Sequence, residues 1–139
     1  MLSAALALLC LPAMSTARPE FAADTGLSCL SCHENGADAG PLTEISREVM
    51  DAAGIGPEDI DLFIPHQANM RIIQAVGSRL KLTNEQVFTN VQRVGNTSAA
   101  SIPLAMVDAR DEGRLRPGSL LLTSAFGGGL TWASSLIRF

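Results

Sequence analysis

Residues 61–80 read DLFIPHQANMRIIQAVGSRL, and this stretch decides the fold class. Its opening apolar run, residues 61–64, ends at Pro65 and predicts a short buried strand. Residues 69–80 then predict a helix with one apolar face, formed by Ile72, Ile73, Val76 and Leu80. His66 therefore follows the carboxyl end of a strand, in the short connection that leads into a helix.

Strand and helix patterns continue on both sides of this stretch. Residues 41–53 predict a helix that Pro41 opens and Gly54 ends, with an apolar stripe of Leu42, Ile45, Val49 and Ala52. Downstream we expect strands over residues 87–94, 119–125 and 130–139, a turn at 95–98, a helix over 98–112 and a glycine turn at 126–129. The alternation predicts an α/β fold.

The predicted helix over residues 98–112 is apolar on every side in its first turns. Its apolar and small residues are Ala99, Ala100, Ile102, Leu104, Ala105, Met106, Val107 and Ala109. A helix that is apolar all round is normally buried, yet 139 residues hold too little other structure to surround it. We therefore expect something outside this chain to cover it, and we expect aggregation or obligate pairing otherwise.

Three polar or glycine-rich clusters follow predicted strands, where α/β proteins usually place their sites. They are residues 65–69 with His66, residues 95–98 with Asn96, and residues 126–129. Each has a plain structural interpretation: His66 as a surface or helix-capping residue, Asn96 as a helix cap, and the glycines as a hairpin. Three such clusters at three strand ends favour a catalytic site.

The stretches PHQANMRII (65–73), GNTSAASIPLA (95–105) and SAFGGGLTWASSLIRF (124–139) together resemble β-ketoacyl-acyl-carrier-protein synthase III, of the thiolase superfamily. The resemblance covers residues 55–139 in order and spacing. It implies half of a thiolase-like fold, a mixed sheet with a buried helix, over residues 41–139. Residues 1–40 would then be an irregular segment or a leader helix.

The resemblance also implies roles for single residues. His66 and Asn96 match the family's catalytic His and Asn, whose N–H groups would stabilise the enolate formed as malonyl thioester loses CO₂. Phe126 matches a Phe beside the nucleophile, and the Gly128 N–H matches an oxyanion-hole donor. Asn69 matches a pantetheine contact. Arg71 matches a residue that docks the acidic carrier protein, with a solvated helix residue as the alternative.

The implied function is that of an acyltransferase that condenses acyl-CoA with malonyl-acyl-carrier protein to start fatty acid synthesis. It needs no cofactor or metal, because CoA and phosphopantetheine thioesters are the substrates. The family's nucleophilic Cys has no match here, so we expect this chain to be inactive without a missing N-terminal half or a full-length synthase. Acyl-carrier protein and a homodimer are the implied partners. A non-catalytic remnant that binds carrier protein is an alternative.

Residues 1–40 carry patterns that are unrelated to this resemblance, namely a possible secretory signal and a haem-attachment motif. Residues 4–12 could be the apolar core of a secretory signal, although no Lys or Arg precedes Arg18; a mis-called start codon is the alternative. Cys29, Cys32 and His33 form the C-x-x-C-H run that attaches c-type haem, so an exported haem protein is a further hypothesis. The alternative is a joined leader with free thiols or a disulfide, and zinc is disfavoured because a second ligand pair is missing.

Charge and composition limit the classes of function and the cellular locations that this chain can have. The net charge of −4 and the pI of about 5.0 give no electrostatic footprint for nucleic acid. No apolar run reaches the roughly 20 residues that span a bilayer. The family works in the cytoplasm, whereas a signal with C-x-x-C-H would place the protein outside it or in the periplasm. We expect the cytoplasm, because the longer segment carries more independent matches.

Overall fold

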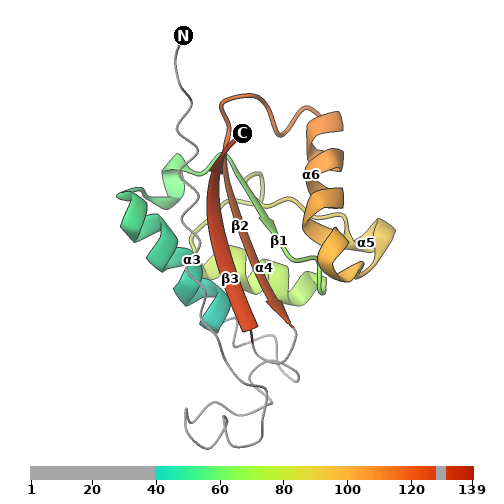
Figure 1. The fold of residues 1–139 in the computed structure, drawn as a ribbon, viewed down its shortest axis with the longest axis horizontal. Coiled ribbons are helices and arrows are strands. Elements are labelled where there is room, and N and C mark those ends of the chain that lie inside the picture. The colour runs from blue at the N-terminus through green and yellow to red at the C-terminus, as the bar shows by residue number, and fades with distance from the viewer. Residues whose placement is uncertain (1–39, 128–130) are drawn as a thin grey trace, which may run out of the picture.

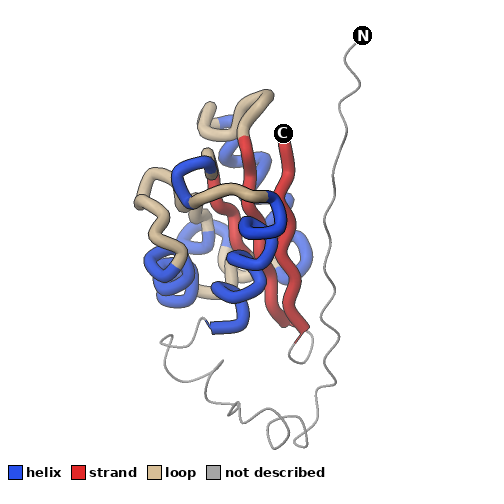
Figure 2. Tube along the Cα trace, turned by 90° about the vertical axis from the view of Figure 1, so that its left-hand side faces the viewer, coloured by secondary structure: helices blue, strands red, loops and turns tan. Residues whose placement is uncertain are grey.

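The computed structural model describes residues 40–127 and 131–139. In this part of the chain, a mixed sheet of three strands has the order β1–β2–β3. β1 (Leu62–Pro65) pairs in parallel with β2 (Leu120–Gly127), and β2 pairs antiparallel with β3 (Thr131–Arg138). Figure 2 shows the strands side by side. The predicted α/β class is confirmed.

Helices cover both faces of this sheet (Figure 1). Phe63 and Leu122 pack in one cluster with residues of α3 (Gly40–Ala53) and α4 (Met70–Arg79). Their neighbours Leu62, Ile64 and Leu121 pack in a second cluster with Ala105 and Ala109 of α6 (Ser101–Asp111). Because successive side chains of a strand point to opposite faces, the two apolar cores follow from the unbroken apolar runs of β1 and β2.

α3 buries most of the predicted stripe. Leu42, Ile45 and Val49 are buried, and Gly54 ends the helix with a φ of +67°. Ala52 was predicted to face inward, but it is exposed, and Met50 is buried in its place. The prediction for Ala52 is wrong because the buried face also includes Ser46 and Met50 and is therefore centred away from Ala52.

The strand predicted over residues 87–94 is wrong. Val87 forms a single parallel bridge with Phe63, and the chain then enters the short helix α5 (Val91–Val94). The backbone amides of Asn90 and Val91 donate to the side chain of Gln67 instead of to a neighbouring strand. The Gln67 side chain therefore accepts the backbone hydrogen bonds that a neighbouring strand would have accepted in the predicted sheet.

The helix predicted over residues 98–112 forms as the 3-10 turn η2 (Ser98–Ala100) followed by α6. Ser101, Ala105 and Ala109 are buried on its inner side, whereas Leu104 and Val107 are 40% and 45% exposed. The described residues therefore cover one side of α6 only. The expectation that something outside this chain covers the other side stays a prediction.

The remaining boundaries shift only slightly. Asn69 caps α4 at its N-terminus, and a second 3-10 turn, η1 (Pro57–Asp59), precedes β1. Phe126 and Gly127 belong to β2 rather than to the predicted glycine turn. No helix among residues 40–127 and 131–139 is long and apolar enough to cross a membrane. The predicted leader and its C-x-x-C-H run lie outside the described residues.

Candidate active site

His66 lies directly after β1, at the edge where the parallel strands β1 and β2 both end. Its backbone N–H donates to the carbonyl of Ser124 in β2 at 2.7 Å, so the pairing of the two strands extends one residue beyond β1. Pro65, the last residue of β1, is itself buried. The main chain of His66 is therefore held by the sheet, and its ring projects from a rigid base.

Two side chains contact the imidazole of His66. Its Nδ1 lies 2.6 Å from the hydroxyl oxygen of Ser101, the first residue of α6. The Phe126 ring lies edge-on, with 6.0 Å between ring centroids and 74° between ring planes. Partial burial of the ring lowers the pKa of His66 below its ordinary value of 6.5. A neutral imidazole carries one donor and one acceptor nitrogen, as the predicted donor role requires.

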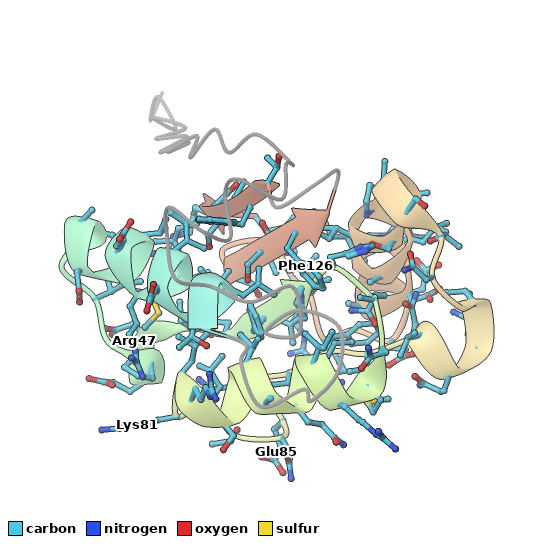
Figure 3. All side chains as sticks on the ribbon, turned by 90° about the horizontal axis from the view of Figure 1, so that it is seen from below. Arg47, Lys81, Glu85 and Phe126 are labelled. Atoms are coloured by element: carbon cyan, nitrogen blue, oxygen red, sulfur yellow. The ribbon has the colours of Figure 1, made fainter. Side chains whose placement is uncertain are left out.

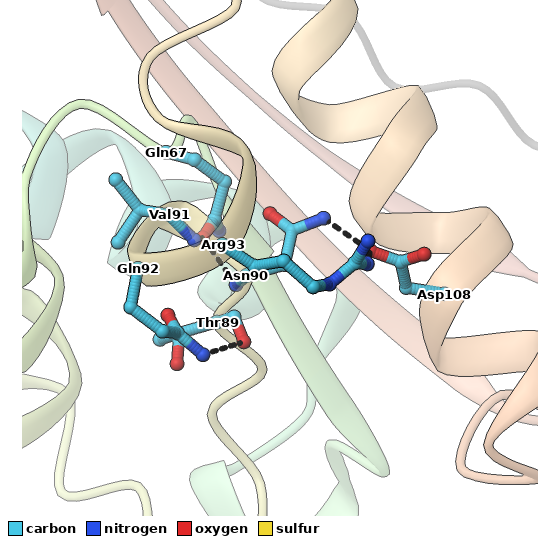
Figure 4. Close-up of polar contacts among 7 residues, drawn as sticks. All are labelled: Gln67, Thr89, Asn90, Val91, Gln92, Arg93 and Asp108. Atoms are coloured by element: carbon cyan, nitrogen blue, oxygen red, sulfur yellow. Dashed lines mark hydrogen bonds and ion pairs between the residues drawn. The ribbon is translucent and has the colours of Figure 1, made fainter.

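Gln67 anchors the His66 connection from inside the molecule. Its side chain has no exposed surface, and its Nε2 donates to the carbonyl oxygens of Pro65 at 2.9 Å and Phe88 at 3.4 Å. Its Oε1 accepts from the N–H groups of Asn90 at 3.0 Å and Val91 at 3.3 Å (Figure 4). One buried amide thus joins the end of β1 to the start of α5 and satisfies four backbone groups.

A second polar contact joins α5 to α6 (Figure 4). The Asn90 amide donates to the carboxylate of Asp108 at 2.6 Å, and Arg93 forms an ion pair with the same carboxylate. The hydrogen bond from Asn90, with Arg93 adding to it, lowers the pKa of Asp108 below its ordinary value. These contacts hold α5 against α6, the two helices that flank the segment containing Asn96.

Asn96 lies in an exposed turn and is not hydrogen-bonded to His66 in the described structure. Its Oδ1 accepts from the N–H of Ser98 at 2.9 Å, which closes a local turn. Gly95 and Ser98 on either side have positive φ angles of +71° and +53°. The structure thus brings His66 and Phe126 together, while Asn96 is held by its own loop.

The other predicted site residues lie around this edge or outside the described part. Figure 3 labels Phe126 near the end of β2, where it pairs with Trp132 of β3. Asn69 is exposed, and its Oδ1 accepts from the Ile72 N–H at 3.0 Å. Arg71 is exposed in the first turn of α4. Gly128, Cys29, Cys32 and His33 lie outside the described residues.

Sequence reasoning missed Ser101 and Gln67. Ser101 is the single hydroxyl in the apolar stretch that opens α6, and Gln67 directly follows the predicted catalytic His. Both are buried, which a polar side chain tolerates only with hydrogen-bonding partners. A lone polar residue inside an apolar pattern was the available signal. Among the described residues, no three His, Cys, Asp or Glu side chains are grouped to hold a metal ion.

Comparison with known proteins decides the family. A family model described as 3-Oxoacyl-[acyl-carrier-protein (ACP)] synthase III C terminal matches residues 50–139. The chain belongs to this family. β-Ketoacyl-[acyl-carrier-protein] synthase III of Nitratidesulfovibrio vulgaris is 55% identical over 98 residues, which are 70% of this chain and 30% of that protein. His66, Asn96 and Phe126 lie within the matched residues 50–139, and their roles stay predictions.

Two solved synthase III structures confirm the fold. The Aquifex aeolicus enzyme has a TM-score of 0.71 at 50% identity, over 73% of this chain and 33% of that one. The Pseudomonas aeruginosa PAO1 enzyme has a TM-score of 0.73 at 33% identity, over 93% of this chain and 41% of that one. The fold is thus thiolase-like α/β. The chain spans about a third of the length of these relatives. The domain boundary at residue 41 stays a prediction.

Proposed function

We propose that this chain supplies the His–Asn half of an acyltransferase that condenses an acyl-CoA primer with malonyl-acyl-carrier protein. The observation that supports the proposal is the position of the His66 ring in the fold. It lies at the common end of two parallel strands, between the Ser101 hydroxyl and the edge of Phe126. This is the position from which a neutral imidazole can aim one N–H at a bound thioester.

In the proposed reaction, His66 and Asn96 donate hydrogen bonds to the malonyl thioester oxygen. The bond between the carboxylate and the α-carbon breaks, CO₂ leaves, and its electron pair forms an enolate whose negative charge is shared by that oxygen. The α-carbon then attacks an acyl group held as a thioester on a cysteine, and the cysteine leaves as a thiolate. Two neutral N–H donors aimed at that oxygen stabilise the negative charge of the enolate.

Candidate contacts for the substrate arm and for the carrier protein lie at the start of α4. Asn69 uses its Oδ1 to cap α4, so its amide nitrogen can donate to a pantetheine arm. Arg71 is exposed two residues further along and would attract the acidic carrier protein. Gly128 would donate its N–H to the acyl thioester oxygen. We propose acyl-carrier protein and a second copy of the synthase as partners, and the cytoplasm as the site of action.

The nucleophilic cysteine has to come from elsewhere, because residues 40–127 and 131–139 contain no cysteine. We therefore expect condensation only when the remaining two-thirds of a synthase III is present. The direct test is a chimera in which residues 42–139 replace the matching segment of the Nitratidesulfovibrio vulgaris synthase III. The assay follows CoA release and CO₂ release with an acyl-CoA and malonyl-acyl-carrier protein.

The chimera is expected to condense, and its His66→Ala variant to lose about 100- to 1,000-fold in kcat, the typical loss of one oxyanion donor. The matched control is Gln74→Ala, which removes an exposed side chain of α4. A folded chimera that binds carrier protein without releasing CO₂ would contradict the proposal and favour the non-catalytic remnant.

The C-x-x-C-H run at residues 29–33 carries a separate proposal for the segment outside the described residues. Two thiols at this spacing can bond the two vinyl groups of haem, and His33 could ligate its iron. Expression with a haem-attachment system and an export signal tests it. A covalent haem spectrum that Cys32→Ser abolishes would support an exported haem segment, whereas an absent spectrum would leave the two cysteines as thiols or a disulfide.

A further inference from the structure

We propose that Ser101 is a positioning residue whose hydroxyl donates to His66 Nδ1, and so holds the imidazole proton on Nε2. The assignment of a reaction to that Nε2–H rests on the function proposed above, whereas the assignment of the tautomer rests on the hydrogen bonds alone.

The geometry around Ser101 is closely defined. Its side chain is 1% exposed, and its Oγ lies 2.6 Å from His66 Nδ1. The backbone N–H of Gln67 donates to the same oxygen at 3.3 Å. Ser101 is the first residue of α6, and α6 packs against β1 and β2 through Ala105 and Ala109, so the packing of this helix holds the hydroxyl relative to β1.

The protons at this site can be counted. Gln67 N–H is only a donor, so the Ser101 oxygen accepts there. If His66 Nδ1 also carried a proton, the Ser101 oxygen would accept twice. Its own proton would then have no acceptor among the described residues, inside a buried site. If Nδ1 is unprotonated, the Ser101 O–H donates to it and every group is satisfied. The second arrangement is favoured because an unpaired buried donor is costly.

The chemical consequence concerns the opposite nitrogen of the ring. A neutral imidazole with an accepting Nδ1 carries its proton on Nε2, and the ring is then oriented by Nδ1. Burial lowers the pKa of His66 and so favours the neutral form that this arrangement needs. Ser101 thus acts on the reaction through His66, without touching the substrate.

The test is a ¹⁵N NMR measurement of the histidine rings in the full chain. The chain has two histidines, so His33→Gln assigns both rings. At a pH well above the His66 pKa, the expected spectrum shows a single tautomer with Nε2 protonated and Nδ1 as a hydrogen-bonded acceptor. The urea-unfolded chain gives the reference mixture of both tautomers. A proton on Nδ1 in the folded wild-type chain would overturn the proposal, and this result needs no variant.

Variants of Ser101 test, in the same NMR measurement, whether its hydroxyl is the group that binds His66 Nδ1. Ser101→Ala should move the Nδ1 resonance toward that of an acceptor without a hydrogen bond, and Ser101→Thr, which keeps the hydroxyl, should restore it. Ser78→Ala, which removes an exposed hydroxyl of α4, is the matched control. A folded Ser101→Ala chain with an unchanged Nδ1 resonance would overturn the proposal.

In the chimera, Ser101→Ala should lower kcat by about 10- to 100-fold with a smaller change in KM, since a displaced catalytic group costs about this much. Ser101→Thr should recover most of the loss. An inactive chimera with the expected NMR spectrum would sink the proposed function and leave the tautomer assignment standing. An active chimera with a protonated Nδ1 would support the proposed function and overturn the tautomer assignment.

Discussion

The connections that carry His66 and Asn96 are built in opposite ways. The His66 connection is tied to β2, α5 and α6 by buried hydrogen bonds from its backbone, from Gln67 and from Ser101. The Asn96 turn is exposed and is closed by one bond within itself, from Ser98. Both residues are proposed to act on the same substrate oxygen, although only the His66 connection is held by buried contacts. The two can therefore be disturbed separately.

The largest expected effect is on the buried connection. Gln67→Ala leaves four backbone groups without their partner and opens space in the core, so we expect the free energy of unfolding to fall by about 3 kcal/mol. Urea titration of the full chain measures it. Gln74→Ala, an exposed glutamine of α4, should change it by less than about 0.5 kcal/mol. Equal effects of the two variants would show that Gln67 is not an anchor.

The exposed turn should behave in the opposite way. Asn96→Ala removes the proposed catalytic donor but only one local hydrogen bond, so in the chimera kcat should fall by about 100-fold or more. The free energy of unfolding should change by about 1 kcal/mol or less. Asn84→Ala, in another exposed turn, is the control and should leave kcat unchanged. A chimera that keeps its full kcat without Asn96 would remove this turn from the site.

The outer side of α6 sharpens the comparison, because it is exposed like Asn96 but apolar. Replacing Leu104 and Val107 together by Ser should change the free energy of unfolding by about 0.5 kcal/mol and reduce self-association of the chain, measured by sedimentation. Leu115→Ala, at a buried position beside α6, should cost about 2 to 5 kcal/mol. A large loss from the exposed pair would mean that this face is already covered within the chain.

The smallest effect is a dependence of stability on pH. Burial lowers the folded-state pKa of His66 below 6.5, so the unfolded chain binds a proton at higher pH than the folded chain. The free energy of unfolding is therefore fully maintained above about pH 6.5 and falls as the pH drops through the lowered pKa. His66→Gln should flatten this slope, and His33→Gln should not. A slope of opposite sign would contradict the burial of the ring.

The sequence predicted the parts whose signals are local. The apolar run of β1 and the apolar face of α4 formed as expected, because propensity and burial agree there. Residues 87–94 were predicted wrongly because their backbone pairs with the side chain of Gln67, a contact that no local pattern encodes. The partnership of Ser101 with His66 joins residues 35 positions apart, so it depends on how α6 packs on the sheet.

The central claim is that His66 and Asn96 act on one oxygen although they belong to differently built connections. A double-mutant cycle in the chimera tests it most directly, with kcat measured for His66→Ala, Asn96→Ala and the double variant. Residues that act as a unit are non-additive, so the double variant should lose far less than the product of the two single losses. Losses that multiply would contradict the claim and would mean that the two side chains act independently.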